Sequence, residues 1–146
     1  MRTKLITLFL LFTSCSREDV QTATSIVEQD YSKGIDHIVW DDIFVQDYDD
    51  YYVYFHSTTC GHCASIKNEM INFYYSTTYQ IYFLDCTNGA EYGPIKNIEG
   101  VSSLDNFYIF GTPFLAELKN HAIYKYYCGV SEIRSFIYKN VYKLID

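Results

Sequence analysis

The chain has 146 residues, a length that suits one compact domain. Hydrophobic residues make up 49% and charged residues 20% of it, a balance that indicates a globular protein and excludes a disordered one. The formal net charge is −7, and Lys and Arg form no cluster beyond residue 17. The sequence therefore lacks the basic surface of a nucleic-acid-binding protein, and we expect no nucleic acid among its partners.

The first fifteen residues differ in pattern from the rest. Arg2 and Lys4 give a positive start, an apolar run follows from Leu5 to Phe12, and small residues close the segment at Cys15. This order is typical of a secretory signal peptide. The apolar run is too short to span a bilayer as a helix.

The end of this segment, Leu11-Phe12-Thr13-Ser14-Cys15, resembles the lipobox of bacterial lipoproteins, with Phe12 in a place usually held by Leu. The resemblance implies that Cys15 is lipidated and becomes the first residue of the mature protein, so that its acyl chains attach the protein to a membrane. An ordinary cleaved signal peptide and an unprocessed chain stay open as alternatives. We expect an extracytoplasmic bacterial protein that is membrane-anchored or secreted.

Residues 16–33 are polar and aperiodic, which predicts a tether between the anchor and a domain over 34–146. The first predicted element of that domain is a helix over about 36–47, with Asp36 as its N-cap. Its apolar residues at helical spacing are Ile35, Ile38, Val39 and Ile43. The acidic run over 41–50 lacks the glycine and terminal Glu of a calcium-binding loop, so we interpret it as a solvated helix end.

The elements after this helix alternate between strands and helices. The sequence predicts a strand at 51–55, a helix after residue 60, a strand at 81–84, a long glycine-containing connection over about 86–110, strands at 114–118 and 122–127, and a helix capped by Ser131. The last two strands are separated by three residues, which indicates a hairpin. Alternating strands and helices imply parallel pairing, and a hairpin adds antiparallel strands. The expected fold class is α/β, with a central mixed sheet flanked by helices.

The motif Cys60-Gly61-His62-Cys63 lies where the strand at 51–55 passes into the next helix. Disulfide exchange requires an exposed thiolate and a second thiol that can reach it. Unpaired N–H groups at a helix N-terminus lower the pKa of a cysteine there, and Cys63 lies one turn further on the same side as Cys60. Gly61 would permit the tight turn, and His62 would add a positive charge that stabilises the thiolate.

The run from Val53 to His56 that leads into this motif resembles the thioredoxin superfamily, and Gly111-Thr112-Pro113-Phe114 resembles the cis-proline loop of that family. The resemblance covers about residues 34–146 and implies a thioredoxin-like fold. It also implies that Cys60 is the nucleophile, that Cys63 is the resolving thiol, and that Thr112 and Pro113 contact the substrate backbone. Within the family, the four-residue motif is similar to the active site of protein disulfide isomerases.

One position departs from the family pattern. Thioredoxins and disulfide isomerases commonly have a buried Asp or Glu six residues before the first cysteine, and Tyr54 occupies that place here. Deprotonation of Cys63 would then rely on water, His56 or His62. As a polar residue at a strand end, His56 also has an interpretation without any role in catalysis.

The remaining cysteines leave two alternatives to redox exchange. A zinc site would need four ligands, and the residues that could complete one around Cys60 and Cys63 are scattered: Cys86, Cys128, His56 and His121. We expect no metal and no organic cofactor. The other alternative is a permanent Cys60–Cys63 disulfide in a non-enzymatic surface lipoprotein that binds a partner. Cys86 and Cys128 lie on strands that should not be neighbours, so we expect small buried hydrophobic residues there, and a regulatory role for one of them stays open.

The function that the sequence favours is an extracytoplasmic thiol–disulfide oxidoreductase that acts on cysteines of exported proteins. A membrane thiol donor or acceptor would be a further partner. The direction of electron flow stays open, because His62 favours an oxidase or isomerase but a reductase would fit the same motif.

Overall fold

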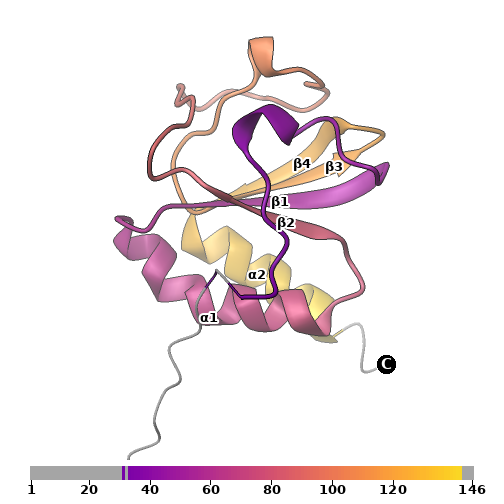
Figure 1. Ribbon diagram of the computed structural model, residues 1–146. Coiled ribbons are helices and arrows are strands. Elements are labelled where there is room, and N and C mark those ends of the chain that lie inside the picture. Colours follow the sequence, from indigo (N-terminus) through magenta and orange to yellow (C-terminus); the bar gives the residue numbers. More distant parts are fainter. Residues whose placement is uncertain (1–30, 32, 143–146) are drawn as a thin grey trace, which may run out of the picture.

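The computed structural model describes residues 31 and 33–142, so the predicted signal segment with Cys15 and most of the predicted tether lie outside the described residues. Two helices lie on one face of a four-stranded sheet, and long loops cover the other face (Figure 1). The elements in chain order are η1 Trp40–Asp42, β1 Asp50–His56, α1 Gly61–Ser76, β2 Ile81–Asp85, η2 Leu104–Asn106, β3 Phe114–Lys119, β4 Ala122–Cys128 and α2 Gly129–Tyr142. No helix among the described residues is long and apolar enough to span a membrane.

The strand order is β2-β1-β3-β4. β1 pairs in parallel with β2, as Phe55 opposite Leu84 illustrates, and it pairs antiparallel with β3, where Val53 lies opposite Ala116. β3 and β4 form an antiparallel hairpin. The predicted α/β class with a mixed sheet is therefore confirmed, because α1 connects parallel strands and the closing hairpin adds the antiparallel ones.

Two cores form because successive residues of β1 point to opposite faces of the sheet. Val53 and Phe55 pack on the loop side, whereas Tyr52 and Tyr54 face the helices. The helix-side core includes residues that repeat at helical spacing: Ile66, Met70 and Phe73 of α1, and Ile133, Phe136 and Ile137 of α2. Burying a side chain as large as Phe55 contributes about 1.5–3 kcal/mol to folding, so the sheet is held firmly where β1 leads into the Cys60 motif.

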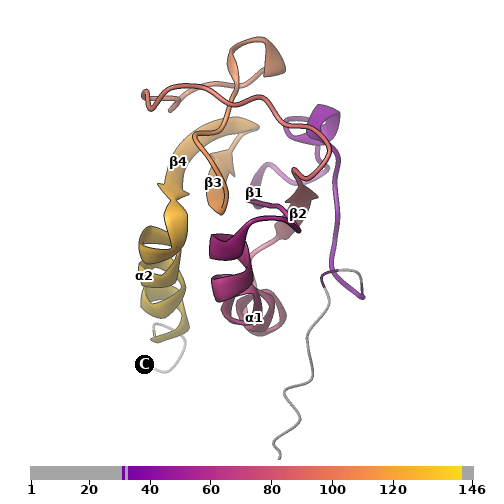
Figure 2. The ribbon, with the colours of Figure 1, turned by 90° about the vertical axis from the view of Figure 1, so that its left-hand side faces the viewer.

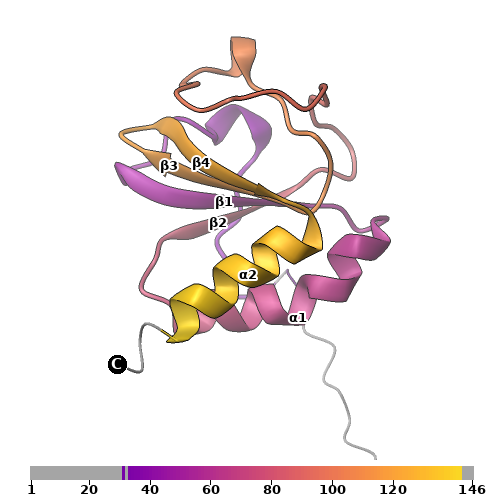
Figure 3. The ribbon, with the colours of Figure 1, turned by 180° about the vertical axis from the view of Figure 1, so that it is seen from behind.

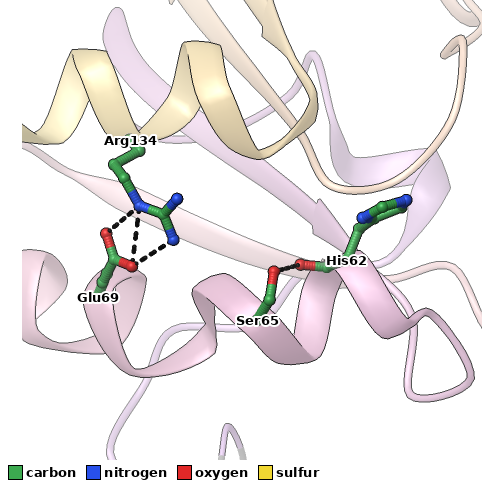
Figure 4. A network of polar contacts seen from close by, with 4 residues as sticks. All are labelled: His62, Ser65, Glu69 and Arg134. Carbon is green, nitrogen blue, oxygen red and sulfur yellow. Dashed lines mark hydrogen bonds and ion pairs between the residues drawn. The ribbon is translucent and has the colours of Figure 1, made fainter.

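The two helices lie side by side beneath the sheet (Figure 3). An ion pair joins them, in which Arg134 of α2 contacts both carboxylate oxygens of Glu69 of α1 (Figure 4). The shortest of these contacts, from Nη2 to Oε1, is 2.6 Å.

The connection between β2 and β3 is part of the core of the domain. Its residues Ile98, Phe107 and Ile109 are buried against the loop side of the sheet. Tyr92 and Ile109 form a parallel bridge across the connection itself. The predicted long connection is therefore present, and it replaces helices as the cover of this face.

The predicted hairpin between β3 and β4 is present, but its turn is the two residues Asn120 and His121, because Lys119 pairs with Ala122 as part of β3. Both turn residues have positive φ angles, 47° and 58°. A two-residue turn of this type twists in the sense that suits antiparallel strands, and Asn accepts such a backbone conformation readily.

The predicted helix over 36–47 is wrong. Only the single 3₁₀ turn Trp40–Asp42 forms, and the residues before it are extended. His37 bridges Phe83 at the outer edge of β2: the Ile38 N–H donates to the Phe83 carbonyl at 3.0 Å, and the Phe83 N–H donates to the Asp36 carbonyl at 2.8 Å. The edge of β2 offers main-chain groups that need partners, and this tertiary demand overrides the local helical spacing.

The start of α2 also differs from the prediction, because the helix begins at Gly129 and includes Ser131. The carboxylate of Glu132 accepts the main-chain N–H of Cys128 at 2.8 Å, as the acid of a capping box does. Gly129 has a φ of +81° and donates its N–H to the Pro113 carbonyl at 2.9 Å. This contact holds the start of α2 to the loop that precedes β3.

We expect Gly129→Ala to lower the free energy of unfolding by about 1 kcal/mol, because L-residues resist positive φ. A Cβ at this position would meet no atom within 4 Å, so the cost would come from the backbone alone. Urea unfolding of the variant and the parent measures the difference. An unchanged midpoint would mean that the backbone relaxes to a negative φ.

Candidate active site

Cys60 is the N-cap of α1. It follows β1 and a three-residue loop, has an extended backbone (φ −92°, ψ 113°), and its sulfur accepts the main-chain N–H of Cys63 at 3.2 Å. An N-cap side chain with this contact is placed directly at the unpaired N–H groups of the helix. The expected position of the cysteine pair at a helix N-terminus is confirmed.

The loop before β3 lies opposite the cysteine pair, at the same end of the sheet (Figure 2). The peptide bond between Thr112 and Pro113 is cis. The thiol of Cys60 donates to the Thr112 carbonyl, with sulfur and oxygen 3.3 Å apart. The structure thus brings together Cys60, Cys63, Thr112 and Pro113 from two distant parts of the sequence, and both cysteines are free thiols.

The surroundings give the two thiols different acidities. Burial raises the pKa of Cys60, but hydrogen bonds from Cys63, from the Thr112 side chain and from the His62 main chain outweigh it, so the net shift is downward. Cys63 is 1% exposed, and burial together with its contact to Cys60 raises its pKa. Cys60 is therefore the accessible thiol that ionises first, and Cys63 is the protected thiol that ionises second.

His62 and Gly61 lie in the exposed first turn of α1. The His62 imidazole projects from the start of the helix, and the main-chain carbonyl of His62 accepts a hydrogen bond from the Ser65 hydroxyl at 2.8 Å (Figure 4). A charge effect of the imidazole on Cys60 stays a prediction. A Cβ at Gly61 would meet no atom within 4 Å, so the expected steric need for glycine in this turn is not found. The missing side chain leaves the surface beside Cys60 open.

A cluster of hydroxyl groups holds the loop that leads into Cys60, and the sequence reasoning missed it. The Thr87 hydroxyl accepts the Thr58 N–H at 2.9 Å and lies 3.3 Å from the Ser57 hydroxyl. The carboxylate of Asp85, at the end of β2, in turn accepts the Thr87 N–H at 2.8 Å. Two local sequence features could have indicated this cluster. The spacing Asp85-x-Thr87 is typical of an Asx turn, and a run of hydroxyl-bearing residues begins at Ser57.

The sequence left the role of His56 open. Its side chain lies on the helix-facing side of β1, the side that Tyr54 also faces. His56 is 2% exposed, and neither ring nitrogen has a hydrogen-bond partner. Tyr54, at the position where the proteins that the motif resembles commonly have an acid, is fully buried, and its hydroxyl makes no hydrogen bond of good geometry. Burial lowers the pKa of His56 from 6.5 to about 4, so the imidazole is neutral at pH 7.

The buried His56 predicts a loss of stability in mild acid. In the unfolded chain the imidazole takes up a proton near pH 6.5, whereas in the folded protein it does so near pH 4. The free energy of unfolding should therefore fall as the pH drops from 6.5 to 4, by about 3 kcal/mol for a shift of this size. Urea unfolding at pH 7 and at pH 4.5 measures the change.

The matched control for this prediction is His56→Phe, which keeps an aromatic ring and removes the titration. The variant should lose most of the change in stability between pH 7 and pH 4.5. An equal change in both proteins would show that other groups, and not His56, carry the acid sensitivity.

Cys86 and Cys128 are both free and do not approach each other, since β2 and β4 are the two outer strands of the sheet. The expectation that these two strands are not neighbours is confirmed. Cys86 is buried as predicted, but Cys128 is only half-buried. Among residues 31 and 33–142 no group of three or more His, Cys, Asp or Glu could hold a metal ion.

The strand order, the cysteine pair that opens the helix after the central strand, and the cis-proline loop opposite it define a thioredoxin-like fold. Among solved structures, the chain is similar to the first thioredoxin domain of mouse protein disulfide-isomerase A4. The two share 23% sequence identity over 70% of this chain and 71% of that one, with a TM-score of 0.44. The fold assignment rests on the topology and not on this similarity. No protein-family model and no curated protein sequence matches the chain.

Proposed function

We propose that the protein is a thiol–disulfide oxidoreductase that uses Cys60 and Cys63. The observation that carries the proposal is the unequal pair at the start of α1. Cys60 is partly exposed with a lowered pKa, Cys63 is buried with a raised pKa, and a cis-proline loop faces them. Exchange requires this division between an attacking thiolate and a protected resolving thiol.

In the reductive direction, the Cys60 thiolate attacks a substrate disulfide. A bond forms between Cys60 and one substrate sulfur, and the other substrate sulfur leaves with the electron pair. Cys63 then loses its proton and attacks Cys60, which forms the Cys60–Cys63 disulfide and releases the second substrate thiolate. The two electrons pass from the cysteine pair to the substrate, and the oxidative direction is the reverse.

Thr112 is the group best placed to guide a substrate. Its carbonyl already accepts the Cys60 thiol, and its side chain lowers the pKa of both cysteines. A substrate chain that pairs with the main chain of Thr112 and Pro113 would place its own sulfur beside Cys60.

The substrates that we propose are cysteine-containing exported proteins, reached outside the cytoplasm from a lipid anchor on Cys15. The support is the signal-like pattern of the first fifteen residues and its lipobox-like end. A membrane thiol donor or acceptor would restore the cysteine pair after each turnover.

The anchor has a direct test by fractionation of cells that express the full chain. The parent should be found in the membrane fraction. The Cys15→Ala variant should either be absent from that fraction or keep its uncleaved signal segment. Cys128→Ala serves as the matched control, because it removes a half-buried cysteine within the domain. Equal membrane retention of all three proteins, with Cys15→Ala processed to the same size as the parent, would contradict the lipid anchor.

The enzymatic proposal has a test in turnover. The full chain should accelerate both cleavage and formation of disulfides in a reporter protein in glutathione buffers of graded composition. A variant with Cys60 and Cys63 both replaced by Ala should have no effect on the reporter. If the double variant matches the parent, the oxidoreductase proposal fails and a binding protein takes its place.

A further inference from the structure

The short loop that joins β1 to Cys60 is held by a side chain from another part of the chain. The loop consists of residues 57–59, and Thr87 contacts it from just beyond the end of β2. The Thr87 hydroxyl oxygen accepts the Thr58 N–H at 2.9 Å and lies 3.0 Å from the Thr58 hydroxyl. The Ser57 hydroxyl is 3.3 Å from the same oxygen. One hydroxyl group therefore meets the loop at three points.

The carboxylate of Asp85 fixes the direction of these hydrogen bonds. It accepts the Thr87 N–H at 2.8 Å, and it also accepts the Thr87 hydroxyl. A hydroxyl has one proton to donate and two lone pairs that accept. Because the proton of the Thr87 hydroxyl goes to Asp85, its oxygen is left to accept hydrogen bonds from the loop.

Asp85 is suited to this role because it is ionised. Burial alone would raise the pKa of Asp85, but the two hydrogen bonds from Thr87 outweigh burial, so the pKa lies below its ordinary value. Hydrogen bonds to an ionised acceptor are shorter and stronger than those between neutral groups. The Thr87 side chain is therefore firmly oriented before it meets the loop.

The main chain of Ser57 connects this loop to both cysteines. Its carbonyl accepts the Cys60 N–H at 3.3 Å. Burial, with the contact to Cys60, raises the pKa of Cys63, and a hydrogen bond from the Ser57 main chain opposes this rise. A shift of the loop would therefore change the surroundings of both sulfur atoms.

The position of Cys60 relative to Cys63 depends on the loop. Cys60 is the N-cap of α1 and has an extended backbone, whereas Cys63 belongs to the first turn of the helix. A nucleophile and the atom that it attacks must be held about 3–3.5 Å apart and aligned, and a misplacement of about 1 Å can cost about 100-fold in rate. The helix alone fixes Cys63, so the segment that enters the helix must fix Cys60.

We propose that Thr87, oriented by Asp85, is a positioning residue that holds the 57–59 loop in place for the attack of Cys63 on Cys60. This inference rests on the proposed function. In that step the Cys63 thiolate forms a bond to the Cys60 sulfur, the bond from Cys60 to the substrate sulfur breaks, and the electron pair leaves with the substrate sulfur. Thr87 contacts neither reacting sulfur and acts through the loop.

The test measures the two chemical steps separately in the full chain. Oxidised glutathione forms the mixed disulfide on Cys60, and rapid acid quenching followed by mass analysis gives the rate at which Cys63 releases the glutathione. Thr87→Val keeps the shape of the side chain and removes its hydroxyl. This variant should slow the release by about tenfold, because the loop loses its anchor and the two sulfurs lose their alignment.

Alkylation by iodoacetamide at pH 7 reports on Cys60 alone and should be unchanged in Thr87→Val. The hydrogen bonds that lower the pKa of Cys60 come from Cys63, the Thr112 side chain and the His62 main chain, and Thr87 makes none of them. Equal slowing of release and alkylation would contradict the inference, because Thr87 would then act on the reactivity of Cys60 and not on the attack by Cys63.

Rescue by the conservative variant distinguishes positioning from a general loss of stability. Thr87→Ser restores the hydroxyl and should restore the parental release rate. Thr58 is exposed, so water can replace the lost hydrogen bonds in Thr87→Val, and the variant should fold. Thr87→Ala removes the same hydroxyl and decides the outcome if Thr87→Val does not fold. Slow release in Thr87→Ser as well would overturn the inference.

The matched control is Thr77→Val at the other end of α1. The Thr77 hydroxyl also accepts a main-chain N–H, that of Tyr79 at 3.2 Å, but Thr77 is the C-cap of the helix that Cys60 begins. This variant should keep the parental release rate. Parental release in Thr87→Val, or equal slowing in Thr77→Val, would overturn the inference. Failure of the parent to exchange with glutathione at all would instead contradict the proposed function.

Discussion

Replacement of Cys60 by alanine is expected to abolish disulfide exchange and reduce the reporter reaction to the rate of the buffer alone. The reason is geometric: within the pair, only Cys60 is both partly exposed and held at the N–H groups that begin α1. Cys63, which is 1% exposed, cannot reach a protein substrate in its place. The reporter assay in glutathione buffer measures the loss.

The matched control for Cys60→Ala is Cys128→Ala. This variant also removes a free thiol from the domain, but Cys128 ends the outer strand β4, whereas the pair lies at the start of α1. It should retain parental activity. Full activity of Cys60→Ala would show that the mechanism is wrong, whatever the redox state of the other cysteines.

Replacement of Cys63 by alanine is expected to trap the protein on its substrates. The hydrogen bonds from Thr112 and from the His62 main chain, which lower the pKa of Cys60, stay in place in this variant. The first attack by Cys60 should therefore proceed. No resolving thiol then follows, and the Cys60–substrate disulfide should accumulate. Non-reducing gels of the full chain mixed with a disulfide-containing protein reveal the conjugate, which added dithiothreitol should dissolve.

Cys86 is the residue that could invalidate this expectation, because it is a second buried thiol whose pKa is raised in part by Cys63. If Cys86 resolved the mixed disulfide in place of Cys63, no conjugate would accumulate in Cys63→Ala. A conjugate that appears only when Cys86 is also replaced would assign resolution to Cys86 and contradict the pairing of Cys60 with Cys63.

The sequence predicted the elements whose signals are local. The aromatic run that forms β1 is too short for a helix, and the repeat of Ile66, Met70 and Phe73 marks one face of α1. The cysteine motif lay between these two elements, so its place at a helix N-terminus was also predictable. The cis-proline loop was predicted only through the family resemblance.

The predicted helix over 36–47 failed for a tertiary reason. Ile35 is buried in the helix-side core and Ile43 in the loop-side core, because the segment between them passes along the edge of the sheet. The same spacing of apolar residues would suit one face of a helix. Phe83 needs main-chain hydrogen-bond partners at that edge. This need arises from how β2 pairs within the sheet, so the local sequence around residues 36–47 does not indicate it.

The same limit applies to the site. The hydroxyl cluster around Thr87 joins residues about thirty positions apart, and its local turn signals do not indicate that they meet. His56 has an ordinary sequence context at the end of a strand. Its surroundings include the ring of Tyr31, which packs against it from a segment that was predicted as a polar tether.

The most direct test of the central claim is the reduction potential of the Cys60–Cys63 pair in the full chain. The protein is equilibrated against graded glutathione or dithiothreitol buffers, and mass analysis of the peptide that holds both cysteines gives the oxidised fraction. We predict one two-electron transition with a midpoint between about −120 and −270 mV, the range of exchanging thioredoxin-like pairs. A pair that stays oxidised below about −300 mV, as structural disulfides do, or that never exchanges, would contradict the account.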